Sequence, residues 1–300
     1  MSDGNSVIVE AWNTILYEKF VRYRHLLVDG LAVHSEEALR RHPPPPGSRV
    51  LDVGCGFGDS TLRIANKVGA QGQALGVDCA PRFVAAASEA AGAAGVGNAA
   101  FFVADVERDD LQGPYDRVFS RFGTMFFTMP GAAMRNIRRA LAPGGELLMI
   151  VWRRREDNPW VHEAELCVRQ IVPVVSHEET DQVHCGPGPF SMAGADLVSD
   201  LLKSAGFDQI GFERFDAPIC IGRDLDEAVR LAMDLGPAGE IIRLAGEEGA
   251  RHKGAVVDSL RRVLGPYRRD DGSVWAPSSI WFVGARNPAA GSRPGAGPPP

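Results

Sequence analysis

Residues 49–152 alternate between two sequence patterns, and this alternation constrains the fold more than any other feature of the chain. Short aliphatic or β-branched runs such as RVLDV and QALGVD are followed by stretches with helical spacing, such as TLRIANKV and PRFVAAASEAA. The alternation continues through AAFFVAD, YDRVFS, AAMRNIRRALA and ELLMIVW. Strands that alternate with helices form βαβ units, which build a parallel sheet with helices on both faces. The sequence therefore predicts a doubly wound α/β fold with a mostly parallel sheet.

The N-terminal part of the chain has a helical pattern of its own. Apolar side chains recur every three or four positions over residues 7–28, which predicts an amphipathic helix. The four consecutive prolines at 43–46 then favour an extended spacer, because proline cannot continue a helix. We expect residues 1–46 to form a helical lid, which could also serve as a contact in a homo-oligomer.

The main domain is expected over residues 47–286, with two insertions. Prolines interrupt the pattern at about 153–193, which predicts a cap or lid, and helical spacing at about 218–270 predicts a helical insertion. The tail 287–300 is rich in Gly and Pro, so we expect it to be disordered.

Charge and cysteine usage exclude several classes of protein. Lys and Arg number 32 against 38 Asp and Glu, a net charge of −6, so no overall positive field attracts nucleic acid or an anionic membrane. The five cysteines are widely spaced and form no C-x-x-C pair, which argues against a disulfide framework or a metal site. The N-terminus lacks the basic and apolar regions of a signal peptide. We expect a cytoplasmic protein without a metal ion.

The turn after the first predicted strand carries the strongest indication of ligand binding. In VLDVGCGFGDS, Asp52 ends the strand, and Gly54, Gly56 and Gly58 lead into a helix. Glycines allow backbone N–H groups to approach a ligand beside the partly positive helix N-terminus. The spacing is G-x-G-x-G instead of the dinucleotide pattern G-x-G-x-x-G, and Asp52 would repel a pyrophosphate. A cationic or amine-bearing ligand fits better.

Two further acids end the next two predicted strands. Asp78 can accept hydrogen bonds from both hydroxyls of a ribose. Asp105 can accept from the exocyclic amine of adenine, while the Val106 N–H donates to a ring nitrogen. An adenosine with a positively charged, amine-bearing tail describes S-adenosylmethionine. The alternative is that each acid only caps a helix, but three caps at successive strand ends form an improbable coincidence.

At these motifs the sequence resembles the class I S-adenosylmethionine-dependent methyltransferases. The matching runs are VLDVGCGFGDS, LGVD, VAD, YDRVFSRFG and ALAPGGELLMIVW, over about residues 47–152. The run SRFGTMFF is also similar to the ubiquinone/menaquinone-type small-molecule methyltransferases. The resemblance implies a Rossmann-like sheet of seven strands. It also implies cofactor contacts by Asp52, Gly54 and Gly56 to the methionine part, Asp78 to the ribose, Asp105 and Val106 to the adenine, and Ser120 and Arg121 near the methyl group.

The predicted activity is methyl transfer from S-adenosylmethionine to a small-molecule acceptor. Such an in-line displacement needs chiefly alignment in a dry pocket, so a dedicated catalytic residue is not required. The candidates for a general base are His162 and His184 in the predicted cap and His25 in the N-terminal helix, although a lone histidine is usually only a polar surface residue. Two alternatives are an NAD-dependent oxidoreductase and a non-catalytic protein that binds an adenosyl ligand.

Several aromatic residues allow two interpretations. The cluster Met125 to Phe127 could form the floor of a substrate pocket, but packing is the more common role of such a cluster. Trp152, Asn158 and Trp160 follow the fifth predicted strand, where they could face the acceptor or only belong to a loop that shields the core from solvent. Tyr17, Tyr23, Arg24 and His25 are better placed than most residues for a site role if the N-terminal helix folds over the cofactor, although aromatic stripes are usually packing.

Overall fold

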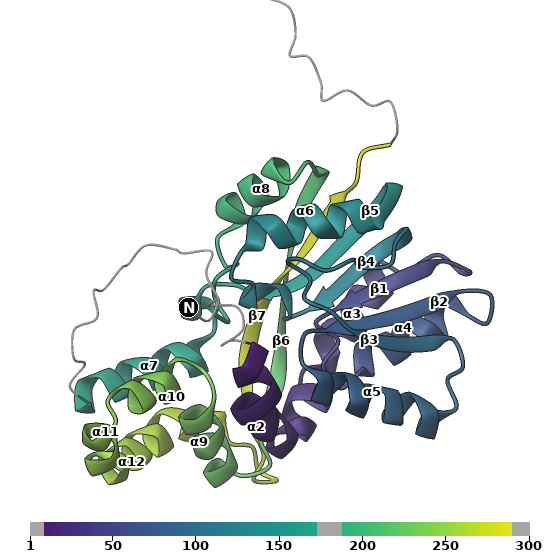
Figure 1. The fold of residues 1–300 in the computed structure, drawn as a ribbon. Helices are drawn as coiled ribbons and strands as arrows, with labels where there is room; N and C mark the ends of the chain where they lie inside the picture. Colours follow the sequence, from purple (N-terminus) through teal and green to yellow (C-terminus); the bar gives the residue numbers. More distant parts are fainter. Residues whose placement is uncertain (1–8, 173–187, 290–300) are drawn as a thin grey trace, which may run out of the picture.

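The computed structural model describes residues 9–172 and 188–289, and its central element is a seven-stranded sheet. The strand order is β3-β2-β1-β4-β5-β7-β6 (Figure 1). The pairs among β1 to β5 are parallel, whereas β7 is antiparallel to both β5 and β6. This confirms the predicted fold class. The strands are β1 (Arg49–Val53), β2 (Gln73–Asp78), β3 (Ala99–Val103), β4 (Tyr115–Arg121), β5 (Leu141–Trp152), β6 (Asp208–Gly222) and β7 (Val274–Arg286).

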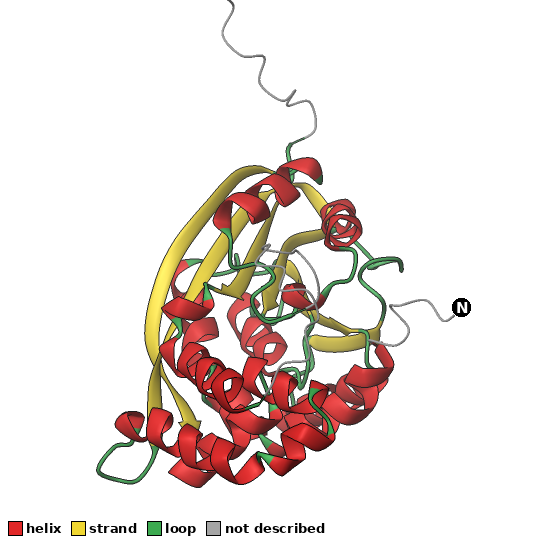
Figure 2. Ribbon diagram, turned by 90° about the vertical axis from the view of Figure 1, so that its left-hand side faces the viewer, coloured by secondary structure: helices red, strands yellow, loops and turns green. Residues whose placement is uncertain are grey.

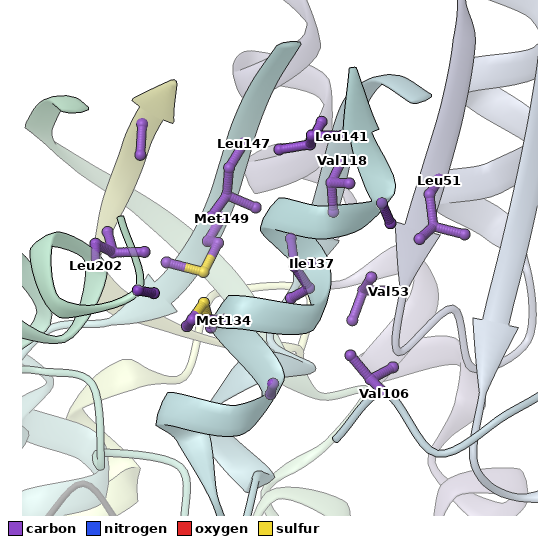
Figure 3. Packing of buried hydrophobic residues seen from close by; sticks show 14 of the residues in the cluster. Leu51, Val53, Val106, Val118, Met134, Ile137, Leu141, Leu147, Met149 and Leu202 are labelled. Carbon is purple, nitrogen blue, oxygen red and sulfur yellow. The ribbon is translucent and has the colours of Figure 1, made fainter. Parts of the chain in front are cut away.

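Four helices flank the sheet as connections between strands. They are α4 (Asp59–Val68), α5 (Pro81–Ala94), α6 (Pro130–Ala140) and α8 (Ala195–Ser204). The apolar face of α6 packs on the middle of the sheet, where Met134 and Ile137 lie among side chains of β1, β4 and β5 (Figure 3). This face is fully buried, which fixes α6 against the sheet. A short helix, η3 (Thr124–Phe126), follows β4 at the carboxyl edge of the sheet.

The N-terminal segment is helical but not one continuous helix. It consists of η1 (Trp12–Leu16), α2 (Tyr17–Arg22), η2 (His25–Asp29) and α3 (Ala32–Arg41), where η1 and η2 are π-helical. The prediction of a single helix over 7–28 is therefore wrong at Tyr23, where the backbone leaves the helical region with φ −102° and ψ 19°. π-helical turns let one helix change the side chains it presents to its neighbours.

The second insertion forms a helical group at the far end of the β6–β7 pair. Its helices are α9 (Leu225–Asp234), α10 (Pro237–Leu244), α11 (Glu247–Arg251), α12 (Lys253–Leu264) and η5 (Gly265–Tyr267). The first insertion contributes η4 (Arg155–Asp157) and α7 (Pro159–Ile171), and α7 packs on α10 and α12. β6 runs on to Gly222 and β7 begins at Val274, so the helices occupy less than the predicted 218–270. Figure 2 shows the strands curving along one side of the molecule, with helices gathered at its lower end.

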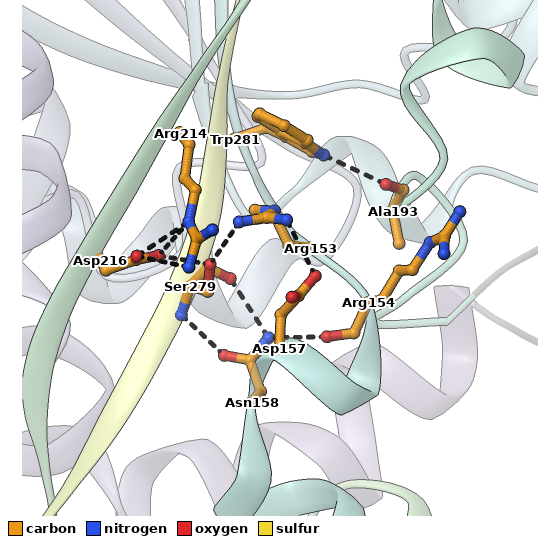
Figure 4. A network of polar contacts seen from close by, with 9 residues as sticks. All are labelled: Arg153, Arg154, Asp157, Asn158, Ala193, Arg214, Asp216, Ser279 and Trp281. Carbon is orange, nitrogen blue, oxygen red and sulfur yellow. Dashed lines mark hydrogen bonds and ion pairs between the residues drawn. The ribbon is translucent and has the colours of Figure 1, made fainter.

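One buried side chain, Asn158, fastens the start of α7 to the sheet. Its Nδ2 donates to the carbonyls of Arg154 and Ser279, at 3.0 and 3.2 Å, and its Oδ1 accepts from the Ser279 N–H at 2.9 Å (Figure 4). Arg153 continues the network, because it contacts the Ser279 hydroxyl at 3.2 Å and Asp157 at 3.2 Å. The cap at the carboxyl edge of the sheet is thus held by polar contacts to β7.

We expect an Asn158→Ala variant to lose about 2–3 kcal/mol of unfolding free energy, because the variant leaves the buried Ser279 N–H without its partner and removes one of the two hydrogen bonds that the Arg154 and Ser279 carbonyls each accept. Urea unfolding monitored by tryptophan fluorescence measures this loss. Ser204→Ala is the control, since the Ser204 hydroxyl lies at the exposed end of α8, and we expect a change below about 0.5 kcal/mol. Equal stabilities of the two variants would contradict the anchoring role.

Candidate functional site

The glycine turn connects β1 to α4 with three residues in left-handed backbone conformations. Gly54, Gly56 and Gly58 have φ of 68°, 53° and 82°. A Cβ on Gly54 would lie 2.8 Å from Gly123 Cα, whereas a Cβ on Gly56 would meet nothing within 4 Å. Gly54 therefore allows two backbone segments to pack closely, and the space beside Gly56 is open to a ligand.

Asp78 joins the end of β2 to this turn. Its carboxylate accepts from the Gly56 N–H at 3.0 Å and, through the other oxygen, from the Ala80 N–H at 3.0 Å. Burial raises the pKa of Asp78, and these backbone hydrogen bonds oppose that shift. The Asp78 backbone carbonyl accepts from the Ala104 N–H, so the start of the Asp105 loop lies beside it. The structure thus places Asp78 next to both the glycine turn and the end of β3.

Asp105 and Val106 follow β3 in the predicted position. The Asp105 carboxylate is partly buried and accepts from the Glu107 N–H at 2.9 Å, a turn that orients it at the edge of the sheet. Burial raises the pKa of Asp105. The Val106 side chain is 5% exposed and packs in the core beneath, so only its backbone is suited to contact a ligand.

Asp52 lies deeper than the other two acids and is 1% exposed. Its Oδ2 accepts from the hydroxyls of Ser60 and Thr61, at 2.7 and 2.6 Å. Its Oδ1 is buried and has no hydrogen-bond partner among the described residues. Burial raises the pKa of Asp52 to about 6, against the effect of the two hydroxyls and of the Arg121 charge.

Arg121 and Ser120 end β4 and point to different surroundings, because side chains alternate along a strand. Arg121 Nη2 lies 2.9 Å from the Asp59 carboxylate, and Arg121 Nη1 is buried without a hydrogen-bond partner in the described chain. Ser120 is fully buried, and its hydroxyl donates to the Val53 carbonyl at 2.8 Å. Ser120 therefore supports the glycine turn from beneath instead of facing a ligand, which corrects its expected place near the methyl group.

The three histidines predicted as candidate bases do not gather at the turn. His25 Nε2 lies 3.1 Å from the buried Glu227 carboxylate of α9, and the His25 side chain is 33% exposed. His162 lies partly exposed in the first turns of α7. His184 lies outside the described residues. Their part in catalysis stays a prediction.

His34 was not among the predicted site residues, although it lies behind the site. Its ring packs edge-on to Phe122, Trp152 and Phe215, and its Nε2 lies 2.9 Å from the Ser278 hydroxyl. Burial lowers the pKa of His34 to about 3, and the Arg121 charge adds to this shift. The ring is therefore neutral at physiological pH and is too weak a base to remove a proton from an acceptor. No sequence pattern singled out His34, because the predicted apolar stripe ends at residue 28.

The N-terminal segment lies against the glycine turn. The Arg24 guanidinium stacks 4.7 Å from the ring centre of Phe57, which belongs to the turn. Tyr17 contacts the rings of Phe57 and Phe83 with centroid distances of 6.1 and 4.9 Å. Of the four residues predicted for a helix that folds over the site, Tyr17 and Arg24 thus lie beside the turn, whereas Tyr23 and His25 contact Asp234 and Glu227 of α9.

The other ambiguous aromatic residues are mainly packing residues. Met125 is 1% exposed in the core, and Phe126 and Phe127 pack against the same cluster. Trp152 stacks on Phe122 at 4.5 Å. Trp160 also packs in an apolar cluster, but its buried Nε1 has no partner among the described residues.

Over residues 9–172 and 188–289, no group of three or more His, Cys, Asp or Glu side chains is arranged to hold a metal ion. No helix in these ranges combines the length and the apolar character that crossing a membrane requires.

Comparisons with known proteins agree with this geometry. The family "Methyltransferase domain" matches residues 50–145, which contain the glycine turn and all three acids. Aklanonic acid methyltransferase DauC of Streptomyces sp. (strain C5) is 32% identical over 105 residues, which are 35% of this chain and 48% of that protein. Nocamycin O-methyltransferase of Saccharothrix syringae is 28% identical over 177 residues, 56% of this chain and 61% of that protein. The chain thus spans about half to three fifths of the length of these two relatives.

A third relative and the solved structures extend the similarity. Ubiquinone/menaquinone biosynthesis C-methyltransferase UbiE of Pseudomonas syringae pv. syringae (strain B728a) is 25% identical over 179 residues, 58% of this chain and 70% of that protein. A putative methyltransferase of Bacillus halodurans superposes with a TM-score of 0.56 at 14% identity, covering 86% of this chain and all of that one. YcgJ of Bacillus subtilis superposes with a TM-score of 0.54 at 16% identity, covering 87% of this chain and 99% of that one. Residues 50–145 of the chain therefore form a methyltransferase domain, and the sheet has the fold of these two solved structures.

Proposed function

We propose that this protein transfers a methyl group from S-adenosylmethionine to a small-molecule acceptor by in-line displacement. The observation that carries the proposal is a pair of buried, oppositely charged groups beside the glycine turn. Asp52 Oδ1 and Arg121 Nη1 both lack a partner among the described residues. Both side chains face the start of α4, because Arg121 pairs with Asp59 while the next two residues, Ser60 and Thr61, donate to Asp52.

This pair suits the amino-acid end of S-adenosylmethionine. An α-ammonium would neutralise the Asp52 carboxylate, and an α-carboxylate would accept from Arg121 Nη1. Asp78 would hold the ribose and Asp105 the adenine, in the order in which β1, β2 and β3 lie in the sheet. When bound, the cofactor supplies an electrophilic methyl group on a sulfonium.

The residues of this chain would then align the acceptor and exclude water. The helical group α9–α12 and α7 would enclose the acceptor, since they lie beyond the ends of the long β6–β7 pair. For an acceptor that must lose a proton, we propose His25. Its Nε2 faces Glu227, so its Nδ1 is the ring nitrogen left to accept the proton.

The class of acceptor rests on charge and on the relatives. One relative is named aklanonic acid methyltransferase and another nocamycin O-methyltransferase. A ribosomal RNA methyltransferase of Xylella fastidiosa also matches, with 45% identity, but over only 71 residues. The net charge of −6 disfavours an RNA acceptor, because RNA binding needs a positive surface. We therefore propose a small organic acceptor.

Calorimetry with S-adenosylmethionine and S-adenosylhomocysteine tests the cofactor, and we expect binding of both. No binding at millimolar concentration would refute the proposal, and thermal stabilisation by NADH alone would favour an oxidoreductase. Turnover is tested with a panel of phenols, carboxylic acids and amines, with mass spectrometry as the readout. Tight binding without methylation of any compound would favour a non-catalytic protein.

Cofactor affinity should depend on pH through Asp52. Burial raises the pKa of Asp52 to about 6, so the carboxyl gains its proton as the pH falls through this value and loses its attraction for the ammonium. We expect S-adenosylmethionine to bind about tenfold more weakly at pH 5 than at pH 7. Without cofactor, the pH dependence of the unfolding free energy has the opposite sign. The native state holds the Asp52 proton more tightly than the unfolded chain does, so Asp52 contributes more stability at the lower pH.

The control for this pH dependence is Asp52→Asn, which should bind weakly with a flatter profile between pH 5 and 7. An equally steep profile in Asp52→Asn would assign the titration to another group.

A further inference from the structure

The N-terminal segment has a second set of contacts, opposite to the glycine turn. On one side, Arg24 and Tyr17 lie against Phe57 of the turn. On the other side, the segment is fastened to the end of α9 by Asp234. Figure 1 shows α2 lying between α9 and α5. The segment therefore bridges the helical group and the cofactor turn.

Three donors of the segment converge on Asp234. The Tyr23 hydroxyl donates to Asp234 Oδ2 at 2.6 Å, and Arg22 Nη1 lies 3.0 Å from the same oxygen. Lys19 Nζ donates to the Asp234 backbone carbonyl at 2.6 Å, at the end of α9 where helix carbonyls lack partners. Tyr23 is 2% exposed, so its hydroxyl contact is shielded from water better than the Arg22 contact.

The segment depends on such contacts for its conformation. Residues 9–22 form one helical run of fourteen residues, which includes η1 and α2, and η2 contains five; helices of these lengths are at best marginally stable in water on their own. On the α5 side, the Glu18–Arg82 pair is exposed and contributes little, whereas Tyr17 and Phe20 pack on Phe83 and keep these contacts when Asp234 is replaced. Loss of the Asp234 contacts should therefore loosen the segment on α9, where the His25–Glu227 contact remains, and weaken its cover over Phe57.

We propose that Asp234 is a positioning residue that retains the cofactor by holding the N-terminal segment closed over the glycine turn. This rests on the proposed function, since it concerns the same cofactor. It also links the two binding regions: Asp234 lies on the helical group, so a shift of α9 around an acceptor moves the cover of the cofactor. Cofactor exchange then requires the Asp234 contacts to open.

The test compares Asp234→Asn with Asp226→Asn, which removes the same charge from the same helix. Asp226 pairs with Arg261 of α12 instead of the segment, so it controls for the charge and for the stability of α9. Stopped-flow release of S-adenosylhomocysteine from the full-length protein is the readout. We expect release to be about tenfold faster in Asp234→Asn and within twofold of the unchanged protein in Asp226→Asn.

Hydrogen exchange provides a second measurement that needs no cofactor. Amides of residues 12–29 should exchange faster in Asp234→Asn and in Tyr23→Phe, but not in Asp226→Asn. Unchanged release in Asp234→Asn, with tight binding by the unchanged protein, would overturn the proposal and leave the proposed function intact. Unchanged exchange in both segment variants would overturn it as well. Failure of the unchanged protein to bind S-adenosylhomocysteine would instead overturn the proposed function.

Discussion

Replacing Gly54 with alanine is expected to lower the unfolding free energy by about 2–4 kcal/mol and to abolish measurable cofactor binding. The left-handed conformation at φ 68° costs a residue with a Cβ about 1–2 kcal/mol. The new Cβ would also lie 2.8 Å from Gly123 Cα, and relief of this overlap must move one of two backbone segments. Either movement separates the glycine turn from the end of β4. Urea unfolding and calorimetry with S-adenosylhomocysteine measure the two effects.

Gly56→Ala separates folding from binding. Gly56 has φ 53°, but a Cβ there would meet nothing within 4 Å, so only the conformational cost of about 1–2 kcal/mol applies. The methyl group would project into the space that we assign to the cofactor, and we expect binding to weaken at least tenfold. Wild-type affinity in Gly56→Ala would place the ligand elsewhere.

Arg121→Met, at the end of β4, should reduce stability and cofactor affinity by amounts similar to those expected for Gly54→Ala. Arg121 and Asp59 form a mostly buried ion pair, with side chains 10% and 15% exposed. Removal of one partner leaves an uncompensated carboxylate, which typically costs about 3–5 kcal/mol. Cofactor affinity should fall by about 10- to 100-fold, because Arg121 Nη1 no longer donates to the carboxylate of the ligand. Chemical unfolding and calorimetry again provide the readouts.

The double variant Arg121→Met/Asp59→Asn distinguishes the two roles of Arg121. It removes both charges, so most of the lost stability should return, whereas the cofactor affinity should stay low. Recovery of both quantities together would show that Arg121 acts only through Asp59.

The sheet and the three acids were predictable because both follow from local patterns. Each of β1 to β5 is a short apolar run next to an amphipathic helix, and parallel pairing brings their carboxyl ends to one edge. Asp52, Asp78 and Asp105 each end such a run or follow it, so the order of the strands was enough to place them together.

The remaining features depend on contacts between segments that are distant in sequence. Asn158 meets Ser279 across 121 positions, and Tyr23 meets Asp234 across 211. No local pattern indicates such partners, so neither anchor was predicted. The helix break falls at Tyr23, the residue whose hydroxyl contacts α9, and no local pattern indicates it either. Ser120 was misplaced because its motif position indicates the edge of the sheet but not which side the hydroxyl takes.

The position of the helical group between β6 and β7 suggests how proteins of this architecture can diversify. The group leaves the sheet after Gly222 and returns at Val274, and these two residues are paired neighbours in the β6–β7 ladder. A different set of helices could therefore be exchanged between the same two points while the register of the sheet is kept. Such exchange would leave β1 to β5 and the glycine turn in place, but the contacts of Asp234 with the N-terminal segment would have to be replaced along with the helices.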